Sequence, residues 1–323
     1  MTNEYLCAII AASTKFPEEN IMKKIISTLL VAAMLLTALA AFASCNGNKV
    51  TGVKVIDIPL TEEEYAFAVQ KGDTELLNQL NTFMGEIKEN GKFDEIINKY
   101  FGDGTPTAVE SASEMKTDGS QLIVATNAAF EPFEYKTGIY YYGVDMEIMA
   151  LFAEYLDKEL YINNMEFDAV CLSVSAAGGT YTDSDGVEHT VAGGVCDVAA
   201  AGLTVSEDRK EILDFSVSYY DASQMLIVAE NDTTFDNCKT AEDVETILKG
   251  LDKSTSVGVQ NATTGAKYCA GDADWGFDGF AFTTVGYNSG ALAVQNILNG
   301  NVKYVVIDEG PAKAITEKVN AAN

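Results

Sequence analysis

Three residues of this sequence are suited, by type and position, to binding a small charged molecule. Arg209 carries a planar guanidinium whose N–H donors match both oxygens of a carboxylate. Thr264 stands at the start of a predicted helix, where free backbone N–H groups and the helix dipole favour an anion. Asp308 follows a predicted strand and supplies the opposite charge. A molecule with both a carboxylate and an ammonium needs both kinds of partner when it leaves water.

Motifs for acid–base or metal chemistry are few. The single histidine, His189, lies in a polar segment, 180–191, whose alternation around Asp185-Gly186 predicts a β-hairpin. No Gly-x-Ser-x-Gly motif and no Cys-x-x-Cys pair occurs in the sequence. The aspartates at 183–185 lack the ligand spacing of a calcium loop, and those around Trp275 are better interpreted as loop residues. We therefore predict no catalytic residue, no metal ion and no cofactor.

Strands and helices alternate along most of the chain, which predicts parallel sheets with helices on both faces. The predicted strands are 53–59, 65–69, 122–126, 198–201, 225–228, 256–260 and 303–307. The predicted helices are one with Thr74 as N-cap, 93–100, 145–156, 167–176, one after Thr263, 290–298 and 311–319. Residues 103–120 are rich in Thr, Ser, Gly, Pro and Glu and indicate a linker.

The composition limits the class of protein and its partners. Of 323 residues, 47% are hydrophobic and 21% charged, which is an ordinary globular mixture long enough for two domains. A formal net charge of −27 argues against nucleic acid or an anionic membrane surface as a partner, because phosphate binding needs clustered lysine and arginine. We interpret the acidity as that of a soluble extracellular surface.

The N-terminal residues predict export. Lys23 and Lys24 precede an apolar run, 25–42, that is short for a membrane span and ends in small residues, as in a signal peptide. Phe42-Ala43-Ser44-Cys45 resembles the lipobox of bacterial lipoproteins, with Phe where Leu is usual, and this implies acylation of Cys45. An uncleaved anchor helix is the alternative. Under either interpretation the rest of the chain lies outside the cytoplasm.

Four further cysteines would lie in an oxidising or semi-oxidising compartment. The simplest pairing joins Cys171 to Cys196 and Cys238 to Cys269, because each pair falls within one stretch of sequence. Free buried thiols are the equally open alternative.

Several motifs between residues 122 and 323 resemble, in order and spacing, those of the family 3 extracellular solute-binding proteins, which capture polar amino acids for ABC importers. These motifs are Phe130-Glu-Pro-Phe-Glu-Tyr135 with Gly143-Val-Asp145, Asp197-Val-Ala-Ala-Ala-Gly202-Leu-Thr204 with Arg209 and Asp214-Phe215-Ser216, Val257–Thr264, and Tyr304–Glu309. The resemblance implies an α/β architecture, the two-lobed periplasmic-binding-protein type II fold, with ligand held in a cleft between lobes joined by two hinge strands.

The resemblance also implies roles for individual residues. It assigns the ligand's α-carboxylate to Arg209 and Thr264. It assigns the ammonium to Asp308, assisted by the Thr204 hydroxyl and the Gly202 carbonyl.

The same resemblance places the ligand side chain between two aromatic rings, those of Phe130 and Phe167. Asn127 stands where relatives often carry an acidic residue, and an amide does not neutralise a cationic side chain. With Gln260, it predicts a polar, uncharged ligand.

The family's usual C-terminal elements occur here at the front of the chain, in Val53–Pro59, Tyr65–Gly72 and Asn90–Gly102. This order implies a circular permutation; a fused fragment of a neighbouring binding domain is the alternative. The expected organisation is a leader and signal peptide at 1–45, lobe two at 53–63 and 230–323, hinge strands at 64–70 and 225–229, lobe one at 71–102 and 122–224, and at 103–121 a linker that joins the ancestral termini.

The expected function is therefore that of an extracytoplasmic, lipid-anchored, monomeric binding protein. It would deliver a polar amino acid to the membrane permease of an ABC importer, with the lipid anchor as its only membrane contact and no nucleic acid as partner. Two alternatives remain open: a dehydratase-like enzyme of the same fold, in which a carboxylate acts as acid or base, and a ligand-sensing module.

Overall fold

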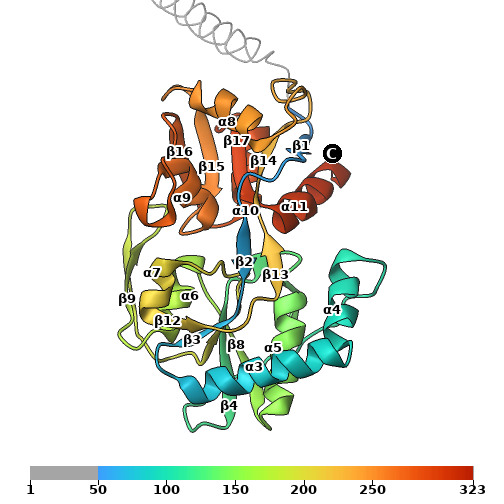
Figure 1. Cartoon of the computed structure of the whole chain (residues 1–323), viewed down its shortest axis with the longest axis vertical. Helices are drawn as coiled ribbons and strands as arrows, with labels where there is room; N and C mark the ends of the chain where they lie inside the picture. The colour runs from blue at the N-terminus through green and yellow to red at the C-terminus, as the bar shows by residue number, and fades with distance from the viewer. Residues whose placement is uncertain (1–49, 323) are drawn as a thin grey trace, which may run out of the picture. The chain divides into compact units, whose positions relative to one another are not determined.

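The structure, a computed structural model, describes residues 50–322 (Figure 1). The predicted signal peptide at 1–45 and the predicted lipidation site Cys45 lie outside the described residues. None of the helices within 50–322 combines the length and the hydropathy that a membrane span requires.

One five-stranded sheet forms lobe two, in the upper half of Figure 1. Its strand order is β1 (Val53–Ile56), β14 (Gln224–Ala229), β17 (Tyr304–Asp308), β15 (Ser256–Gln260) and β16 (Thr283–Tyr287). Strand β15 is parallel to both of its neighbours, whereas β14 runs antiparallel to β1 and β17. The helices of this lobe are α8 (Ala241–Lys249), α9 (Thr264–Ala270), α10 (Gly290–Leu298) and α11 (Glu309–Ala321), with the short 3-10 helix η1 (Ala273–Trp275).

The second five-stranded sheet forms lobe one. Its order is β12 (Leu213–Phe215), β3 (Ala68–Gln70), β11 (Val198–Ala199), β4 (Gln121–Thr126) and β8 (Glu159–Asn164). Strand β4 is parallel to β11 and β8, and β3 is antiparallel to both of its neighbours. The helices are α3 (Thr74–Glu89), α4 (Lys92–Phe101), α5 (Val144–Tyr155), α6 (Phe167–Val174) and α7 (Glu207–Ile212). A small sheet adds β5 (Ala129–Phe130), β6 (Glu134–Thr137) and β7 (Tyr140–Tyr142).

The two lobes are joined by a short antiparallel pair, β2 (Glu63–Tyr65) and β13 (Tyr220–Ala222), which lies between the two sheets (Figure 1). The sequence places the hinge strands at 64–70 and 225–229. Residues 64–65 do belong to β2, but 68–70 form β3 in lobe one and 225–229 belong to β14 in lobe two. Both ranges contain apolar, buried stretches, 65–69 and 225–228, as sheet strands do, whereas β13 carries an exposed aspartate and is too short for a periodic signal.

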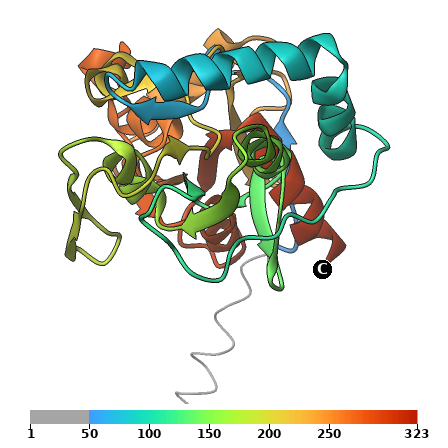
Figure 2. The same ribbon diagram turned by 90° about the horizontal axis from the view of Figure 1, so that it is seen from below.

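The predicted hairpin is confirmed as β9 (Gly179–Thr182) paired with β10 (Glu188–Val191). It stands out from the molecule at the end opposite α4 (Figure 2). The two α/β lobes confirm the predicted fold class.

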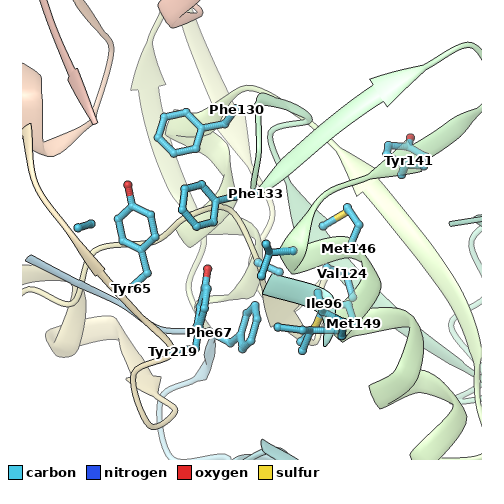
Figure 3. Close-up of a cluster of buried hydrophobic side chains, with 14 of the residues drawn as sticks. Tyr65, Phe67, Ile96, Val124, Phe130, Phe133, Tyr141, Met146, Met149 and Tyr219 are labelled. Atoms are coloured by element: carbon cyan, nitrogen blue, oxygen red, sulfur yellow. The ribbon is translucent and has the colours of Figure 1, made fainter. Parts of the chain in front are cut away.

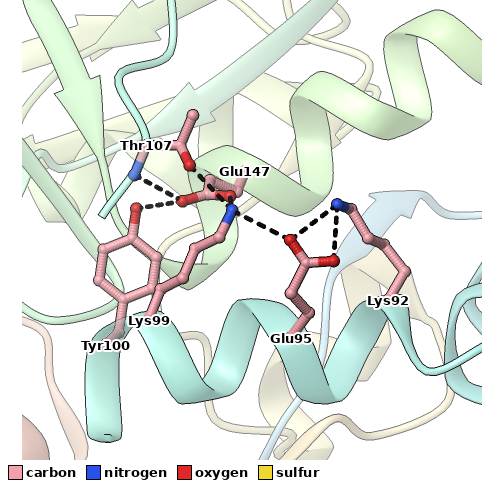
Figure 4. A network of polar contacts seen from close by, with 6 residues as sticks. All are labelled: Lys92, Glu95, Lys99, Tyr100, Thr107 and Glu147. Carbon is pink, nitrogen blue, oxygen red and sulfur yellow. Dashed lines mark hydrogen bonds and ion pairs between the residues drawn. The ribbon is translucent and has the colours of Figure 1, made fainter. Parts of the chain in front are cut away.

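The linker between α4 and β4 is held against lobe one by a network around Glu147 of α5 (Figure 4). The buried Glu147 carboxylate accepts hydrogen bonds from Lys99 Nζ at 2.6 Å, the Tyr100 hydroxyl at 2.7 Å and the Thr107 backbone N–H at 2.9 Å. Further along, Val109 forms an isolated antiparallel bridge with Tyr141. The segment predicted as a linker thus forms no named strand or helix but makes specific contacts along its length.

The structure decides two local expectations. Asp73 rather than Thr74 caps α3, since its carboxylate accepts the Leu76 N–H at 3.1 Å and Thr74 is already helical. Of the two arrangements left open for the cysteines, the structure has the unpaired one: Cys171, Cys196, Cys238 and Cys269 are free thiols. Proximity in sequence does not provide the Cβ geometry that a disulfide requires.

Candidate functional site

Residues predicted to bind the ligand meet where the two lobes touch. Three of these residues donate hydrogen bonds across the lobes: Arg209 Nη2 to the Ala262 carbonyl at 3.2 Å, Thr264 Oγ1 to Thr204 Oγ1 at 3.1 Å, and Gln260 Nε2 to Asn127 Oδ1 at 3.4 Å. Each donor–acceptor pair comes from segments far apart in sequence. The contacts among them build one polar junction out of loops at the ends of β4, β11 and β15.

Arg209 is the buried cation of this junction. Its side chain belongs to α7, the residue is 8% exposed, and Nη1 donates to the Thr204 carbonyl at 2.8 Å. The guanidinium carbon lies 5.6 Å from the ring centroid of Phe167 and 5.3 Å from that of Trp275, within cation–π range of both. No carboxylate among residues 50–322 forms an ion pair with it. Arg209 therefore keeps N–H donors and a positive charge for an anion.

Asp308 is the corresponding buried anion. It is 4% exposed, and its Oδ1 accepts a hydrogen bond from the Tyr65 hydroxyl at 2.5 Å. Burial, with the nearby charge of Glu63, raises the pKa of Asp308 to about 7. Within the described part of the chain no lysine or arginine pairs with it. An ammonium placed beside it would favour the ionised form.

Gly202 brings backbone, not a side chain, to the junction. Gly202 has a φ of +52°, and a Cβ there would lie 2.8 Å from Cε1 of Phe130. Its N–H donates to Asp145 Oδ2 at 3.0 Å, and the Tyr219 hydroxyl donates to Asp145 Oδ1 at 2.6 Å. Burial raises the pKa of Asp145 to about 7, although both hydrogen bonds act in the opposite direction.

Tyr65, whose hydroxyl bonds to Asp308, belongs to an aromatic cluster (Figure 3). Tyr65 and Phe133 meet edge to face at 5.0 Å between centroids, and Phe130 lies 6.2 Å from Phe133. Phe130 belongs to this cluster, whereas Phe167 lies next to Arg209 on α6. The two rings predicted to enclose a ligand side chain are therefore in different packing environments.

Asn127 and Gln260, which were predicted to contact the ligand side chain, already form hydrogen bonds with other protein groups. Besides its bond to Gln260, Asn127 donates from Nδ2 to the Met165 carbonyl at 2.7 Å, and Gln260 Oε1 accepts the Gly290 N–H at 3.1 Å. At the neighbouring helix, Thr263 is the N-cap of α9 and Thr264 its first residue.

Two carboxylates at the junction were missed by sequence reasoning. Glu63 of β2 accepts a hydrogen bond from Thr204 Oγ1 at 2.8 Å and another from Gln224 Nε2 at 3.0 Å. Glu134 of β6 is fully buried, and neither of its oxygens has a hydrogen-bond partner in the described part of the chain. Burial, and then the charges of Asp145 and Asp308, hold the pKa of Glu134 well above its usual range. The acidic run at 62–64 was the one available signal for Glu63.

A cavity of about 1100 Å³ adjoins Thr204 and Thr264 on the side of β2 and β13. One basic residue, Lys210, lines it together with eight acidic residues: Glu62, Glu63, Glu64, Glu207, Asp221, Glu245, Asp274 and Glu309. Arg209 and Phe167 instead line a smaller cavity of about 290 Å³ on the side of the hairpin. The negative field of the larger cavity attracts cations to the junction.

The sequence model of the bacterial extracellular solute-binding proteins, family 3, matches residues 8–103 and 179–319, which together make up more than half of the chain. The chain belongs to this family. Within the family match, residues 50–103 and 179–319 are described by the structure and contain β2, Gly202, Arg209 and Asp308. The family is one of binding proteins that act outside the cell, and this is the class to which the protein is assigned.

Individual relatives match over shorter stretches. An arginine-binding extracellular protein, ArtP, of Bacillus subtilis (strain 168) is 28% identical over 134 residues, covering 41% of this chain and 46% of that protein. A probable histidine-binding protein of Neisseria gonorrhoeae is 36% identical over 55 residues, covering 17% of this chain and 20% of its own length. This family 3 protein thus spans less than half the length of either curated relative.

Among solved structures, the arginine-bound form of a truncated arginine-binding protein from T. maritima is 28% identical, with a TM-score of 0.46. The match covers 62% of this chain and 78% of that one.

Proposed function

We propose that this family 3 protein is an exported, lipid-anchored binding protein that delivers a polar amino acid to the permease of an ABC importer. The observation that carries the proposal is the buried pair Arg209 and Asp308, neither of which has an ion-pair partner among residues 50–322. A lone buried charge is costly, and a zwitterionic α-amino acid supplies both missing partners at once. Names of relatives that bind arginine or histidine support the same ligand class.

The contacts between the lobes suggest how binding would be coupled to closure. Arg209 bonds to Thr204 in its own lobe and to Ala262 in the other, so a carboxylate bound by Arg209 would touch both lobes. A ligand that gains contacts only when the lobes meet shifts the population toward the closed arrangement, and release needs no catalytic group.

The test is thermal unfolding of the protein without residues 1–45, against each of the twenty amino acids. At about a hundred times its dissociation constant, a ligand adds about 2.7 kcal/mol of stability. We expect at least one polar amino acid to raise the melting temperature and Arg209→Ala to abolish that rise. Lys249→Ala, which removes an exposed cation paired with Glu245, is the control and should retain it. A transition that no amino acid moves would contradict the proposal.

Attachment of the protein through Cys45 is part of the proposal and has its own readout. The mass of the protein extracted from membranes should exceed that of the peptide chain by a diacylglycerol unit, and Cys45→Ala should remove the excess.

We also propose that the order of the segments is a circular permutation. Its support is the closeness of the two ends of the described chain: the Val53 N–H donates to Asn320 Oδ1 at 3.0 Å, and Asn320 Nδ2 donates to the Val53 carbonyl at 2.8 Å. Folds tolerate new ends where the old ones are close and the cut is exposed.

The test is a reordered chain in which residues 120–322 are followed by a short Gly-Ser loop and residues 50–102. We expect a soluble monomer by size-exclusion chromatography, with the same ligand-dependent rise in melting temperature as the natural order. A reordered chain that dimerises by exchanging its new C-terminal segment, or that loses the ligand response, would count against the permutation.

A further inference from the structure

The smaller cavity, of about 290 Å³, lies beneath the β9–β10 hairpin. Its wall contains Phe167 and Asp168 of α6, Tyr181 of β9, Arg209 of α7 and, from lobe two, Ala262. Arg209 and Phe167 belong to the proposed amino-acid site, so this cavity shares two side chains with that site. The hairpin therefore contributes to the lining of the proposed site, a role that neither its sequence nor its family predicts.

Asp168 is an anion without a cation in this wall. It is the second residue of α6, is half-buried, and forms no side-chain hydrogen bond or ion pair within residues 50–322. Burial, followed by the negative charges of Glu166 and Asp183, raises its pKa. Burial, and then the charges of Glu166, Asp168 and Asp183, raise the pKa of Tyr181 as well. Asp168 and Tyr181 therefore share the same nearby carboxylates.

The other cations nearby are already neutralised. Lys267, which also lines the cavity, pairs with Asp208 and with Asp272 at 3.0 Å each. His189 bonds to Asp183 at 2.6 Å and lies outside the cavity wall. Arg209 contacts the two carbonyls and the rings described above. Asp168 and Arg209 are thus two opposite charges in one cavity that have no ion-pair partner in the described part of the chain.

The hairpin holds an aromatic ring over this space. The ring of Tyr181 stacks on His189 with centroids 5.0 Å apart and planes 20° apart, and the His189–Asp183 bond ties that histidine to the base of the hairpin turn. Phe167 supplies a second ring beside Arg209. A carboxylate with flanking aromatic faces is a recognition site for an organic cation.

We propose that this cavity receives the cationic side chain, guanidinium or ammonium, of an amino acid whose carboxylate is held by Arg209, with Asp168 as the counter-charge and Tyr181 and Phe167 as flanking rings. The inference rests on the proposed function and names its ligand class. It replaces the uncharged ligand predicted from Asn127, whose amide is occupied by Gln260 and Met165. Asp168 of α6 would take the place of the acidic residue that relatives often carry at the position of Asn127.

The test compares arginine with citrulline, which has the same shape but a neutral urea group, by isothermal titration calorimetry of the protein without residues 1–45. We expect arginine to bind about tenfold more tightly than citrulline. In Asp168→Asn this ratio should fall to near one through loss of arginine affinity alone. Tyr181→Leu should lower the ratio in part. Glu188→Gln, the same chemical change at an exposed site on the hairpin, should leave it unaltered.

The outcomes separate the two proposals. If citrulline or glutamine binds as tightly as arginine, or if Asp168→Asn leaves the ratio unchanged, the cationic subsite is overturned while amino-acid binding stands. If no amino acid binds, both proposals fall. An unchanged melting temperature of unliganded Asp168→Asn distinguishes a ligand contact from a purely structural role.

Discussion

The free energy of unfolding is expected to decrease as the pH rises from 4 to 7, against the usual trend of acid denaturation. Asp145 and Asp308 have pKa values of about 7 in the folded protein, compared with the ordinary 3.8 of an aspartate. Between these values the folded state binds more protons than the unfolded state, so stability falls with pH. Each of the two carboxyls lowers the free energy of unfolding by about 1.4 kcal/mol per pH unit, or roughly 4 kcal/mol between pH 4 and 7.

The sign follows from the direction of the shifts. A folded pKa raised by burial leaves stability intact below the unfolded pKa, and this stability is lost as the pH rises through the folded pKa. Asp208, bonded to Ser206 and Lys267, has its pKa lowered to about 2, so its contribution is lost only as the pH falls from 4 toward 2. The two windows do not overlap, and maximum stability is expected near pH 4 to 5.

Glu134→Gln tests the same effect at a third buried carboxyl. Its pKa is raised in the same direction, and neither oxygen has a donor to lose, so the amide removes the titration without breaking a hydrogen bond. Urea unfolding at pH 4.5, 6 and 8 should show a shallower dependence than in the wild-type protein. Glu154→Gln, at an exposed position on α5, should keep the wild-type slope. Equal slopes for the two variants would contradict the assignment.

Local elements were the part of the fold most accessible from sequence. Helix 290–298 and strand 256–260 have the predicted bounds, because the apolar residues of each recur at the spacing of its element and polar residues flank them. The hairpin at 180–191 was predicted from alternation around Asp185-Gly186 and has that turn in the structure. These features depend on neighbours in sequence, so the sequence contains their signal.

What the sequence did not provide depends on contacts between distant segments. Glu63 and Trp275 meet predicted ligand residues because of how β2 and η1 cross the junction. In the sequence, Asp168 looks like an ordinary acidic residue in the first turn of a helix, where the helix dipole stabilises a negative charge. Asp168 becomes a candidate ligand residue only because the hairpin lines the same cavity. Glu134 lies within a motif quoted from the sequence, yet burial without a partner is visible only in three dimensions.

The second large effect is expected at Gly143, the N-cap of α5. Its φ is +122° and its ψ is 162°, and a Cβ there would lie 2.0 Å from the carbonyl oxygen of Phe133 and 2.4 Å from its carbonyl carbon. Gly143→Ala is therefore both conformationally strained and sterically blocked by backbone, which does not yield as a side chain does. We expect a loss of at least about 4 kcal/mol in the free energy of unfolding, measured with urea.

The matched control is Gly138→Ala, in the turn between β6 and β7. Gly138 also has a positive φ, +65°, but a Cβ there meets nothing within 4 Å, so the expected cost is about 1 kcal/mol. Equal losses for the two variants would show that strain alone, and not the clash with Phe133, sets the cost at Gly143.

The packing of Gly143 against Phe133 also affects the binding junction. The close approach at Gly143 allows the Asp145 N–H to reach the Phe133 carbonyl at 2.9 Å and the Val144 N–H to reach that of Pro132 at 3.2 Å. That register positions Asp145 under Gly202. Any Gly143→Ala protein that remains folded should therefore also lose ligand-dependent stabilisation, whereas Gly138→Ala should retain it. The Gly143-Val-Asp145 motif would then be explained by backbone packing that supports the site rather than by contact with a ligand.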